Sequence, residues 1–165
     1  MATCGSALWH VELVNMASKN NNGSVLVHGR TSGRSSLGLK GDNVIDLAKA
    51  IRSGFSFATL IRFQRHSGLA LRLLTEVMHM PARTLARRKA AGTLSPEESE
   101  RLLRLAGLFD KAVALFEGDR AAAAKWLQTP NQALGNLAPL NLAQTEVGGR
   151  AAEDLIGRLE FGVYS

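Results

Sequence analysis

The chain has 165 residues, of which 45% are hydrophobic and 5% aromatic, a composition typical of a globular protein with one domain or two small ones. Its single cysteine, Cys4, excludes a disulfide within the chain and a metal site built on cysteines. No apolar run approaches the length of a membrane span, and the start lacks the features of a secretory signal, so we expect a cytoplasmic protein without membrane contact.

Basic and acidic residues are unevenly distributed along the chain, whose formal net charge is +6. Residues 52–94 contain eight Lys and Arg side chains against one acidic residue, Glu76, which gives 8 − 1 = +7. From Asp110 onward, five basic residues stand against seven acidic ones, which gives 5 − 7 = −2. A basic block followed by an acidic one suggests two different partners, the first of which is a candidate for nucleic acid.

The first 41 residues differ in composition from the rest of the chain. The stretch from Lys19 to Gly41 is rich in Asn, Gly and Ser and includes K-N-N-N-G-S and G-R-T-S-G-R-S-S-L-G. Such a composition buries too little apolar surface to offset the entropy that is lost on ordering. We therefore predict a flexible N-terminal arm over residues 1–41.

From Asp42 onward, apolar residues recur at helical spacing, and no segment shows sustained strand alternation. Residues that can cap a helix precede the apolar runs: Asp42, Ser56, Ser95, Asp119 and Thr145. We expect helices over residues 42–53, 56–68, 69–78, 81–90, 95–118, 119–127 and 145–162. The sequence therefore predicts an all-α fold.

The segment Ser95-Pro96-Glu97-Glu98 marks the start of the longest predicted helix. Ser95 can cap the helix, Pro96 suits the first helical position, and Glu98 can reach back as in a capping box. The helix then carries apolar residues at helical spacing: Leu102, Leu105, Ala106, Phe109, Val113 and Phe116. This stripe is either a core face or a candidate dimer surface, and we expect core for most of it.

Residues 71–89, L-R-L-L-T-E-V-M-H-M-P-A-R-T-L-A-R-R-K, have the pattern of a helix-turn-helix, in which two short helices are joined by a tight turn. Apolar residues fall where the helices and turn need them: Leu71, Leu74, Met78, Met80 and Leu85. His79 occupies a turn position that a glycine would ease, although histidine tolerates positive φ better than most residues. Pro81 has the backbone angle for a first helical turn.

The outward residues of the second helix of this motif are candidate DNA contacts. They are Ala82, Arg83, Ala86 and Arg87, with Arg88 and Lys89 following at the end of the helix. An outward arginine can give guanine two parallel hydrogen bonds, and the terminal cations suit phosphates. Arg88, however, lies where such motifs usually have an apolar residue. The alternative is an ordinary basic helical hairpin.

The C-terminal part of the sequence carries a resemblance to a known family. Residues 126–165 read WLQTPNQALGNLAPLNLAQTEVGGRAAEDLIGRLEFGVYS, with the pattern Trp126-Leu127, Pro130-Asn131, Ala133-Leu134-Gly135, Pro139-Leu140, Leu142, Thr145, Gly148, Leu155, Arg158 and Gly162. This segment resembles the toxin-binding domain of the Xre/MbcA/ParS-like antitoxins. The preceding residues, including R-T-L-A-R-R-K and L-S-P-E-E-S, resemble the Xre-type helix-turn-helix of the same family. The resemblance runs from about Asp42 to the end.

The resemblance implies an antitoxin of a two-gene toxin–antitoxin module. Its usual partner would be a RES-domain toxin, which is similar to ADP-ribosyltransferases and destroys cellular NAD. The C-terminal segment would cover the toxin's active-site entrance, and the N-terminal domain would bind operator DNA in the module's own promoter, as a homodimer. The implied organisation is an arm (1–41), a helix-turn-helix bundle (42–118) and a small helical toxin-binding domain (119–165), without a cofactor.

The end of the chain supplies the candidate toxin contacts. Behind the capping residue Thr145, an apolar face is expected from Ala152, Leu155, Ile156 and Leu159, which suits insertion into a cleft. The predicted toxin-binding residues are Leu155, Arg158, Leu159, Phe161, Gly162, Val163, Tyr164 and Ser165. The acidic Glu153, Asp154 and Glu160 are candidates to complement basic groups in the toxin.

Residue patterns typical of an enzyme are weak in this sequence. The four histidines lack metal-ligand spacing, and the glycine-rich stretch 29–38 lacks the Gly-Lys-Ser/Thr ending of a phosphate loop. Three interpretations follow: an antitoxin that occludes a toxin, a stand-alone helix-turn-helix transcriptional regulator with a helical dimerisation or effector domain, and an undetected enzyme. We favour the antitoxin and predict no catalytic residue.

Overall fold

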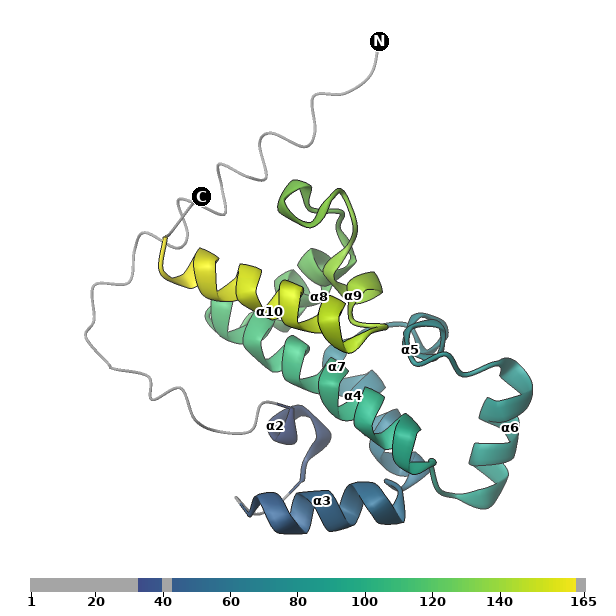
Figure 1. The fold of residues 1–165 in the computed structure, drawn as a ribbon. Helices are drawn as coiled ribbons and strands as arrows, with labels where there is room; N and C mark the ends of the chain where they lie inside the picture. Colours follow the sequence, from purple (N-terminus) through teal and green to yellow (C-terminus); the bar gives the residue numbers. More distant parts are fainter. Residues whose placement is uncertain (1–32, 40–42, 163–165) are drawn as a thin grey trace.

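A computed structural model describes residues 33–39 and 43–162, and in these residues the chain forms helices and two isolated bridges but no strand of a sheet (Figure 1). The elements in chain order are α2 (Arg34–Leu37), α3 (Val44–Ser53), α4 (Phe57–Ser67), α5 (Leu71–Val77), α6 (Ala82–Ala91), α7 (Pro96–Leu115), α8 (Arg120–Gln128), the 3-10 turn η1 (Gln132–Leu134), α9 (Pro139–Leu142) and α10 (Glu146–Glu160). The prediction of an all-α fold is confirmed.

Local capping explains where most of these helices begin. The hydroxyl of Ser56 accepts a hydrogen bond from Ala58 N, and the carboxylate of Asp119 accepts from two backbone amides of α8. The first predicted helix is capped by Asn43, whose side chain accepts from Ile45 N at 2.9 Å. Asn43 therefore takes the role that we predicted for its neighbour Asp42, which lies outside the described residues.

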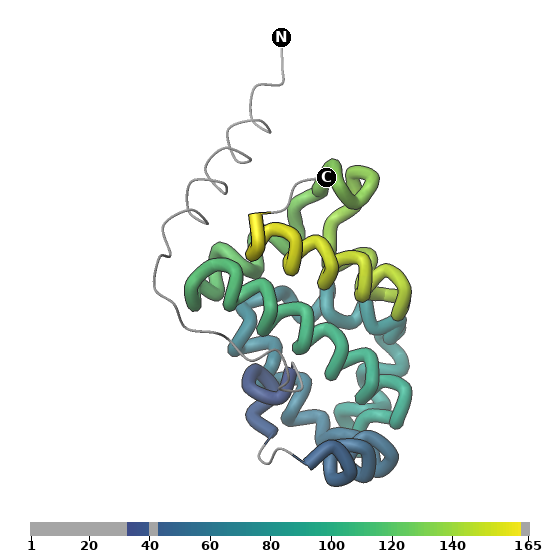
Figure 2. Tube along the Cα trace, turned by 60° about the vertical axis from the view of Figure 1, so that its left-hand side comes forward, coloured from purple at the N-terminus to yellow at the C-terminus, as the bar shows by residue number. Residues whose placement is uncertain are grey.

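The long helix α7 is the centre of the fold. Its predicted capping box is present: Glu98 N donates to Ser95 Oγ at 3.2 Å, and Ser95 N donates to Glu98 Oε2 at 2.7 Å. Helices α2, α3, α4, α8 and α10 all pack against α7, and α10 lies along it in two views of the molecule (Figure 1 and Figure 2). The predicted apolar stripe is a core face, since Leu102 and Phe109 are fully buried.

One hydrophobic core runs through both halves of the chain. Phe63 of α4 meets Phe109 of α7 edge to face, with ring centroids 5.8 Å apart. Further along α7, the ring of Phe116 lies 6.4 Å from that of Trp126 on α8. Ile156 of α10 belongs to the same cluster. The buried side of α7 therefore joins the helix-turn-helix region to the C-terminal helices.

The prediction of a flexible arm over residues 1–41 is wrong for residues 33–39. Leu37 is fully buried in the common core, and α2 packs against α4 and α7. Gly33 N donates to Asp110 Oδ2 at 2.9 Å, and a guanidinium nitrogen of Arg62 donates to the Leu37 carbonyl. A short apolar anchor thus holds this segment despite its Gly-rich and Ser-rich composition. Residues 1–32 and 40–41 lie outside the described residues.

Replacing Leu37 by alanine tests this anchor. Because Leu37 is fully buried, Leu37→Ala should lower the free energy of unfolding by about 2–5 kcal/mol, as measured by urea denaturation. Ser35→Ala, an exposed change in the same helix, should stay within about 0.5 kcal/mol of the wild type. A Leu37→Ala protein as stable as the Ser35→Ala protein would show that α2 does not belong to the core.

Candidate functional site

The helices α5 and α6 and the turn between them form the predicted helix-turn-helix. At the end of α5, His79 N donates to Glu76 O at 3.0 Å and Met80 N donates to Thr75 O at 2.8 Å. These two bonds form a Schellman motif, which needs a left-handed residue directly after the helix cap. His79 is that residue, with φ 52°. The turn is therefore of the predicted kind, with histidine in the position that favours glycine.

Contacts from both sides fix this turn. Met80 is buried, and a guanidinium nitrogen of Arg101 on α7 donates to the carbonyl oxygen of Met78 at 2.9 Å. Pro81 is the N-cap of α6, with φ −59° and ψ 154°. The helix therefore begins at Ala82, one residue later than we predicted. α7 therefore holds the end of α5, and α6 starts from an anchored turn.

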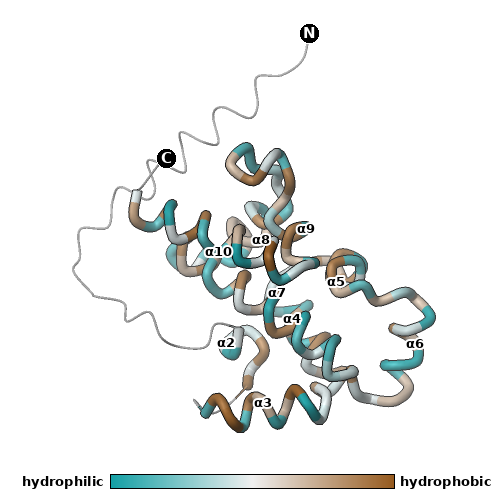
Figure 3. Tube along the Cα trace, in the orientation of Figure 1, coloured by the Kyte–Doolittle hydropathy of each residue, from teal (hydrophilic) through white to brown (hydrophobic). Residues whose placement is uncertain are grey.

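Helix α6 presents most of its side chains outward. None of its residues is buried, and Leu85 is the apolar residue that packs partly against the core. The exposed residues include Ala82, Arg83, Ala86, Arg87 and Lys89, five of the six predicted DNA contacts. Hydrophilic colour along α6 is visible in Figure 3. The structure thus brings these five residues together on one exposed helix.

Arg88, the sixth predicted DNA contact, has a different environment. Its Nε lies 2.8 Å from Oε2 and 3.0 Å from Oε1 of Glu98, and the two side chains are 23% and 9% exposed. This ion pair explains why a basic residue occupies a position where similar motifs usually have an apolar one. A contact between Arg88 and phosphate stays a prediction, and its guanidinium already has a partner on α7.

The remaining basic residues of the 52–94 block lie on α3, α4 and α5. Arg52, Arg62 and Arg65 are all exposed, and Arg62 also donates a hydrogen bond to the carbonyl oxygen of Leu37. Arg72 donates to Glu76 one turn further along α5, and this hydrogen bond together with the carboxylate charge raises the pKa of Arg72 above its ordinary value. The positive charge of the block therefore lies mainly at the surface.

The segment between α8 and α9 is a compact loop that projects at the top of Figure 1. Asn131 caps η1 through its side chain and pairs with Leu137 in an isolated bridge. Gly135 and Asn136 both have positive φ, 66° and 61°. Asparagine tolerates this left-handed conformation better than most residues, so Asn136 can adopt it without a glycine. Leu137 remains 49% exposed at the base of the loop.

One face of α10 packs against the core of its own chain, whereas we expected this face to suit insertion into a cleft of a partner. Leu155 and Ile156 are 5% and 1% exposed, Leu159 packs partly against the same core, and α7 covers them. An amphipathic pattern in the sequence is the same whether the covering surface is the protein itself or a partner, and here it is the protein. Toxin contacts by Leu155 and Leu159 stay predictions that this burial does not favour.

Close backbone packing brings α10 to this position. A Cβ atom at Gly148 would lie 2.2 Å from the carbonyl oxygen of Leu142, so the first turn of α10 approaches α9 as only a glycine allows. Thr145 caps the helix by accepting from Gly148 N at 3.1 Å. Lys111 of α7 forms an ion pair with Glu153 at 2.6 Å. Glu153 therefore has a partner within its own chain, unlike the toxin-facing role that we expected.

The opposite face of α10 is exposed along its whole length. Its residues recur at helical spacing: Val147, Arg150, Ala151, Asp154, Arg158 and Phe161, which we call the outward stripe. Val147 and Phe161, at its two ends, are 80% and 70% exposed. The predicted contacts Arg158, Phe161 and Gly162 are thus accessible, whereas Val163, Tyr164 and Ser165 lie outside the described residues. Val147 and Leu137 are not among the contacts predicted from the sequence, although a helical count backward from Phe161 reaches Val147.

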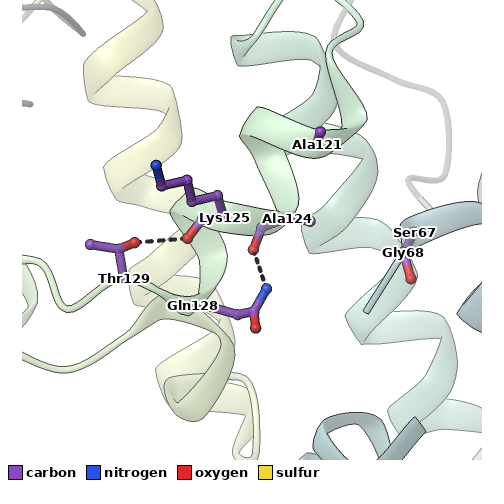
Figure 4. A pocket seen from close by; sticks show the side chains of 7 residues that line it. All are labelled: Ser67, Gly68, Ala121, Ala124, Lys125, Gln128 and Thr129. Carbon is purple, nitrogen blue, oxygen red and sulfur yellow. Dashed lines mark hydrogen bonds between the residues drawn. The ribbon is translucent and has the colours of Figure 1, made fainter. Parts of the chain in front are cut away.

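A shallow hollow lies between the end of α4 and α8 (Figure 4). Its lining is neutral apart from Lys125, and two side chains along it bond to their own helix: Gln128 Nε2 donates to Ala124 O, and Thr129 Oγ1 donates to Lys125 O, both at 2.8 Å.

In the part of the chain that the structure describes, no group of three His, Cys, Asp or Glu side chains could hold a metal ion. No helix in these residues is long and apolar enough to cross a membrane.

Comparison with known families separates the chain into two matched regions. Residues 46–107 match the antitoxin Xre-like helix-turn-helix domain, and residues 111–162 match the antitoxin Xre/MbcA/ParS C-terminal toxin-binding domain. The two matches meet inside α7. The fold and these matches define a helical antitoxin with a helix-turn-helix domain followed by a toxin-binding domain.

Two curated relatives, both named Antitoxin Xre, match most of the chain. The relative from Yersinia enterocolitica is 37% identical over 130 residues, which cover 78% of this chain and 88% of the relative. The relative from Photorhabdus laumondii is 30% identical over 116 residues, 70% of this chain and 78% of the relative. The chain belongs to the Xre family of antitoxins, which confirms the resemblance drawn from its sequence.

The strained residue in the turn offers a test of the helix-turn-helix geometry. A left-handed backbone conformation costs a residue with a Cβ atom about 1–2 kcal/mol, and glycine avoids this cost. Part of the stability gained is lost again, because glycine increases the conformational entropy of the unfolded chain. His79→Gly should therefore raise the free energy of unfolding by about 0.5–1 kcal/mol in urea denaturation. His79→Ala keeps the Cβ atom and should give no increase. A His79→Gly protein that is less stable than the wild type would contradict the observed turn.

Proposed function

We propose that this antitoxin neutralises a RES-domain toxin that degrades NAD, by occluding the toxin's active site, and that it represses its own operon by binding promoter DNA. Membership of the Xre family, with both a helix-turn-helix and a toxin-binding region, supports the proposal. The observation that carries it is the separation of the two candidate surfaces: α6 and the C-terminal end of α10 lie at opposite ends of the molecule (Figure 1). One chain can therefore bind DNA and toxin at the same time, in the cytoplasm.

The DNA-binding part of the proposal rests on α6. Arg83 and Arg87 are four residues apart, so they lie on the same face of the helix, and both are exposed. Ala82 and Ala86 beside them are small enough for the helix to approach base edges closely. Lys89 at the helix end adds a charge suited to phosphate. Helix-turn-helix proteins commonly read two half-sites as dimers, so we include a homodimer in the proposal.

Removing either arginine tests the placement of the recognition helix. Arg83→Ala and Arg87→Ala should each weaken binding to the module's promoter DNA by about 1–3 kcal/mol, because a bidentate contact to a base is lost. Arg150→Ala removes the same charge from the exposed face of α10 and serves as the matched control. Fluorescence anisotropy with a labelled duplex measures the affinity. Equal affinity for all three variants and the wild type would refute this role of α6.

The toxin-binding part rests on the outward stripe and the end of α10. The stripe has an apolar residue at each end, Val147 and Phe161, with charged Arg150, Asp154 and Arg158 between them. A helix of this kind can lie in a groove of a partner, with apolar anchors and a charged rim. Contacts by Arg158 and Phe161 need no rearrangement of α10. The segment from Gly162 to Ser165 continues from this end and is the proposed plug of the active-site entrance.

Truncating Phe161 tests this surface. Phe161→Ala should weaken the complex with the toxin by about 2 kcal/mol or more, as expected for an aromatic anchor at an interface. Val44→Ala shortens another exposed apolar side chain, on α3, and should leave the affinity unchanged. Isothermal titration calorimetry with the toxin gives both values. If the two variants bind the toxin as tightly as the wild type, Phe161 does not belong to the interface.

A further inference from the structure

The orientation of α6 depends on few contacts. None of its ten residues is buried, and its apolar attachment to the core is the half-buried Leu85. Two polar links join its C-terminal end to the rest of the protein: the ion pair between Arg88 and Glu98 of α7, and a hydrogen bond at 2.8 Å from Phe57 N to the carbonyl oxygen of the cap residue Gly92. Any residue that holds the last turn of α6 against α7 therefore has a large effect on the direction in which the outward arginines point.

Glu98 is a fixed anchor for this ion pair. Its Oε2 accepts a hydrogen bond from Ser95 N at 2.7 Å while its own backbone amide donates to Ser95 Oγ. The neighbouring Ser99 is fully buried; its hydroxyl accepts from Phe55 N and donates to the Ser95 carbonyl, both at 2.8 Å. The carboxylate is thus tied to the start of α7 and, through it, to the core.

Burial makes the ion pair costly to break. The Glu98 side chain is only 9% exposed, and a carboxylate with so little access to water requires a cationic or hydrogen-bonding partner. If Arg88 turned toward a DNA phosphate, Glu98 would keep the single backbone donor Ser95 N and lose its charged partner. The electrostatics therefore favour an Arg88 that stays on α7 when DNA is bound.

We propose that Arg88 and Glu98 are positioning residues for DNA recognition: the ion pair fixes the angle of α6 on α7, and Arg83, Arg87 and Lys89 make the contacts. This inference rests on the proposed DNA-binding function and assigns Arg88 a role other than the phosphate contact predicted from the sequence. It also gives a role in DNA binding to Glu98, an acidic residue that a search for basic contacts overlooks.

The sign of the effect at Glu98 tests the proposal in the full-length protein. Removing a negative charge near DNA ordinarily strengthens binding, whereas a positioning role requires that it weaken binding. Glu98→Gln keeps the size of the side chain and an acceptor oxygen, and should lower affinity for a labelled duplex from upstream of the antitoxin's own gene by about tenfold. Glu97→Gln, an exposed change in the same turn, should bind as the wild type or more tightly.

The salt dependence of binding separates positioning from phosphate contact at Arg88. Losing one phosphate contact lowers the slope of log affinity against log salt by about 0.9. Arg88→Gln should weaken binding but keep the wild-type slope, whereas Lys89→Gln should lower the slope. Either of two results overturns the proposal: Glu98→Gln binding that is no weaker than that of Glu97→Gln, or a reduced slope for Arg88→Gln.

A separate readout distinguishes failure of this inference from failure of the proposed function. If the wild type binds neither this duplex nor a scrambled one, the DNA-binding part of the proposed function is wrong. Amide hydrogen exchange of Glu98→Gln then decides the inference. Faster exchange over residues 82–91, with unchanged exchange over residues 146–160, keeps Arg88 and Glu98 as the pair that holds α6. Unchanged exchange over residues 82–91 refutes it.

Discussion

The fold depends on the burial of one long helix, α7. Five other helices pack against it, and its inward residues, among them Leu102, Ala106 and Phe109, are fully buried. Because the side chains of α7 contribute to a core shared by residues 37–156, neither the helix-turn-helix region nor the C-terminal helices can form their observed packing without it. The regions matched by the two family domains therefore share a structural element rather than a flexible linker.

The same constraint decides which residues remain available to partners. Helix α10 turns its apolar face toward α7, which leaves its outward stripe for binding, and α6, which has no buried residue, presents its arginines at the other end of the molecule (Figure 1). Two ion pairs fix these helices to α7, Arg88 with Glu98 and Lys111 with Glu153. α7 thus sets the position of both candidate surfaces at once.

Features that depend on a few neighbouring residues could be predicted from the sequence. The capping box at Ser95 and Glu98, the Thr145 cap and the left-handed turn at His79 involve residues at most five apart, and the structure has all of them. Features that depend on distant residues could not. The burial of Leu37 follows from contacts with α4 and α7, and no local signal distinguishes its surroundings from a flexible segment.

The candidate sites divide in the same way. The outward residues of α6 follow from helical periodicity, and five of the six predicted contacts are exposed. The role of Arg88 depends on Glu98, ten residues further along the chain. For α10, periodicity identified the apolar face around Leu155, but only the packing on α7 reveals that this face is buried in the protein itself and that Val147 lies on the exposed side.

The most direct test of the proposed function is co-expression of this chain with the neighbouring gene, with cell growth, NAD content and co-purification as readouts. Full-length antitoxin is compared with a chain that stops after Leu159, which keeps the buried face of α10 and removes residues 160–165, Phe161 among them. We expect a stable complex and preserved NAD with the full chain, and loss of the complex, NAD depletion and arrested growth with the shortened one. A shortened chain that still binds the toxin and preserves NAD would contradict the proposal that the end of the chain occludes the active site.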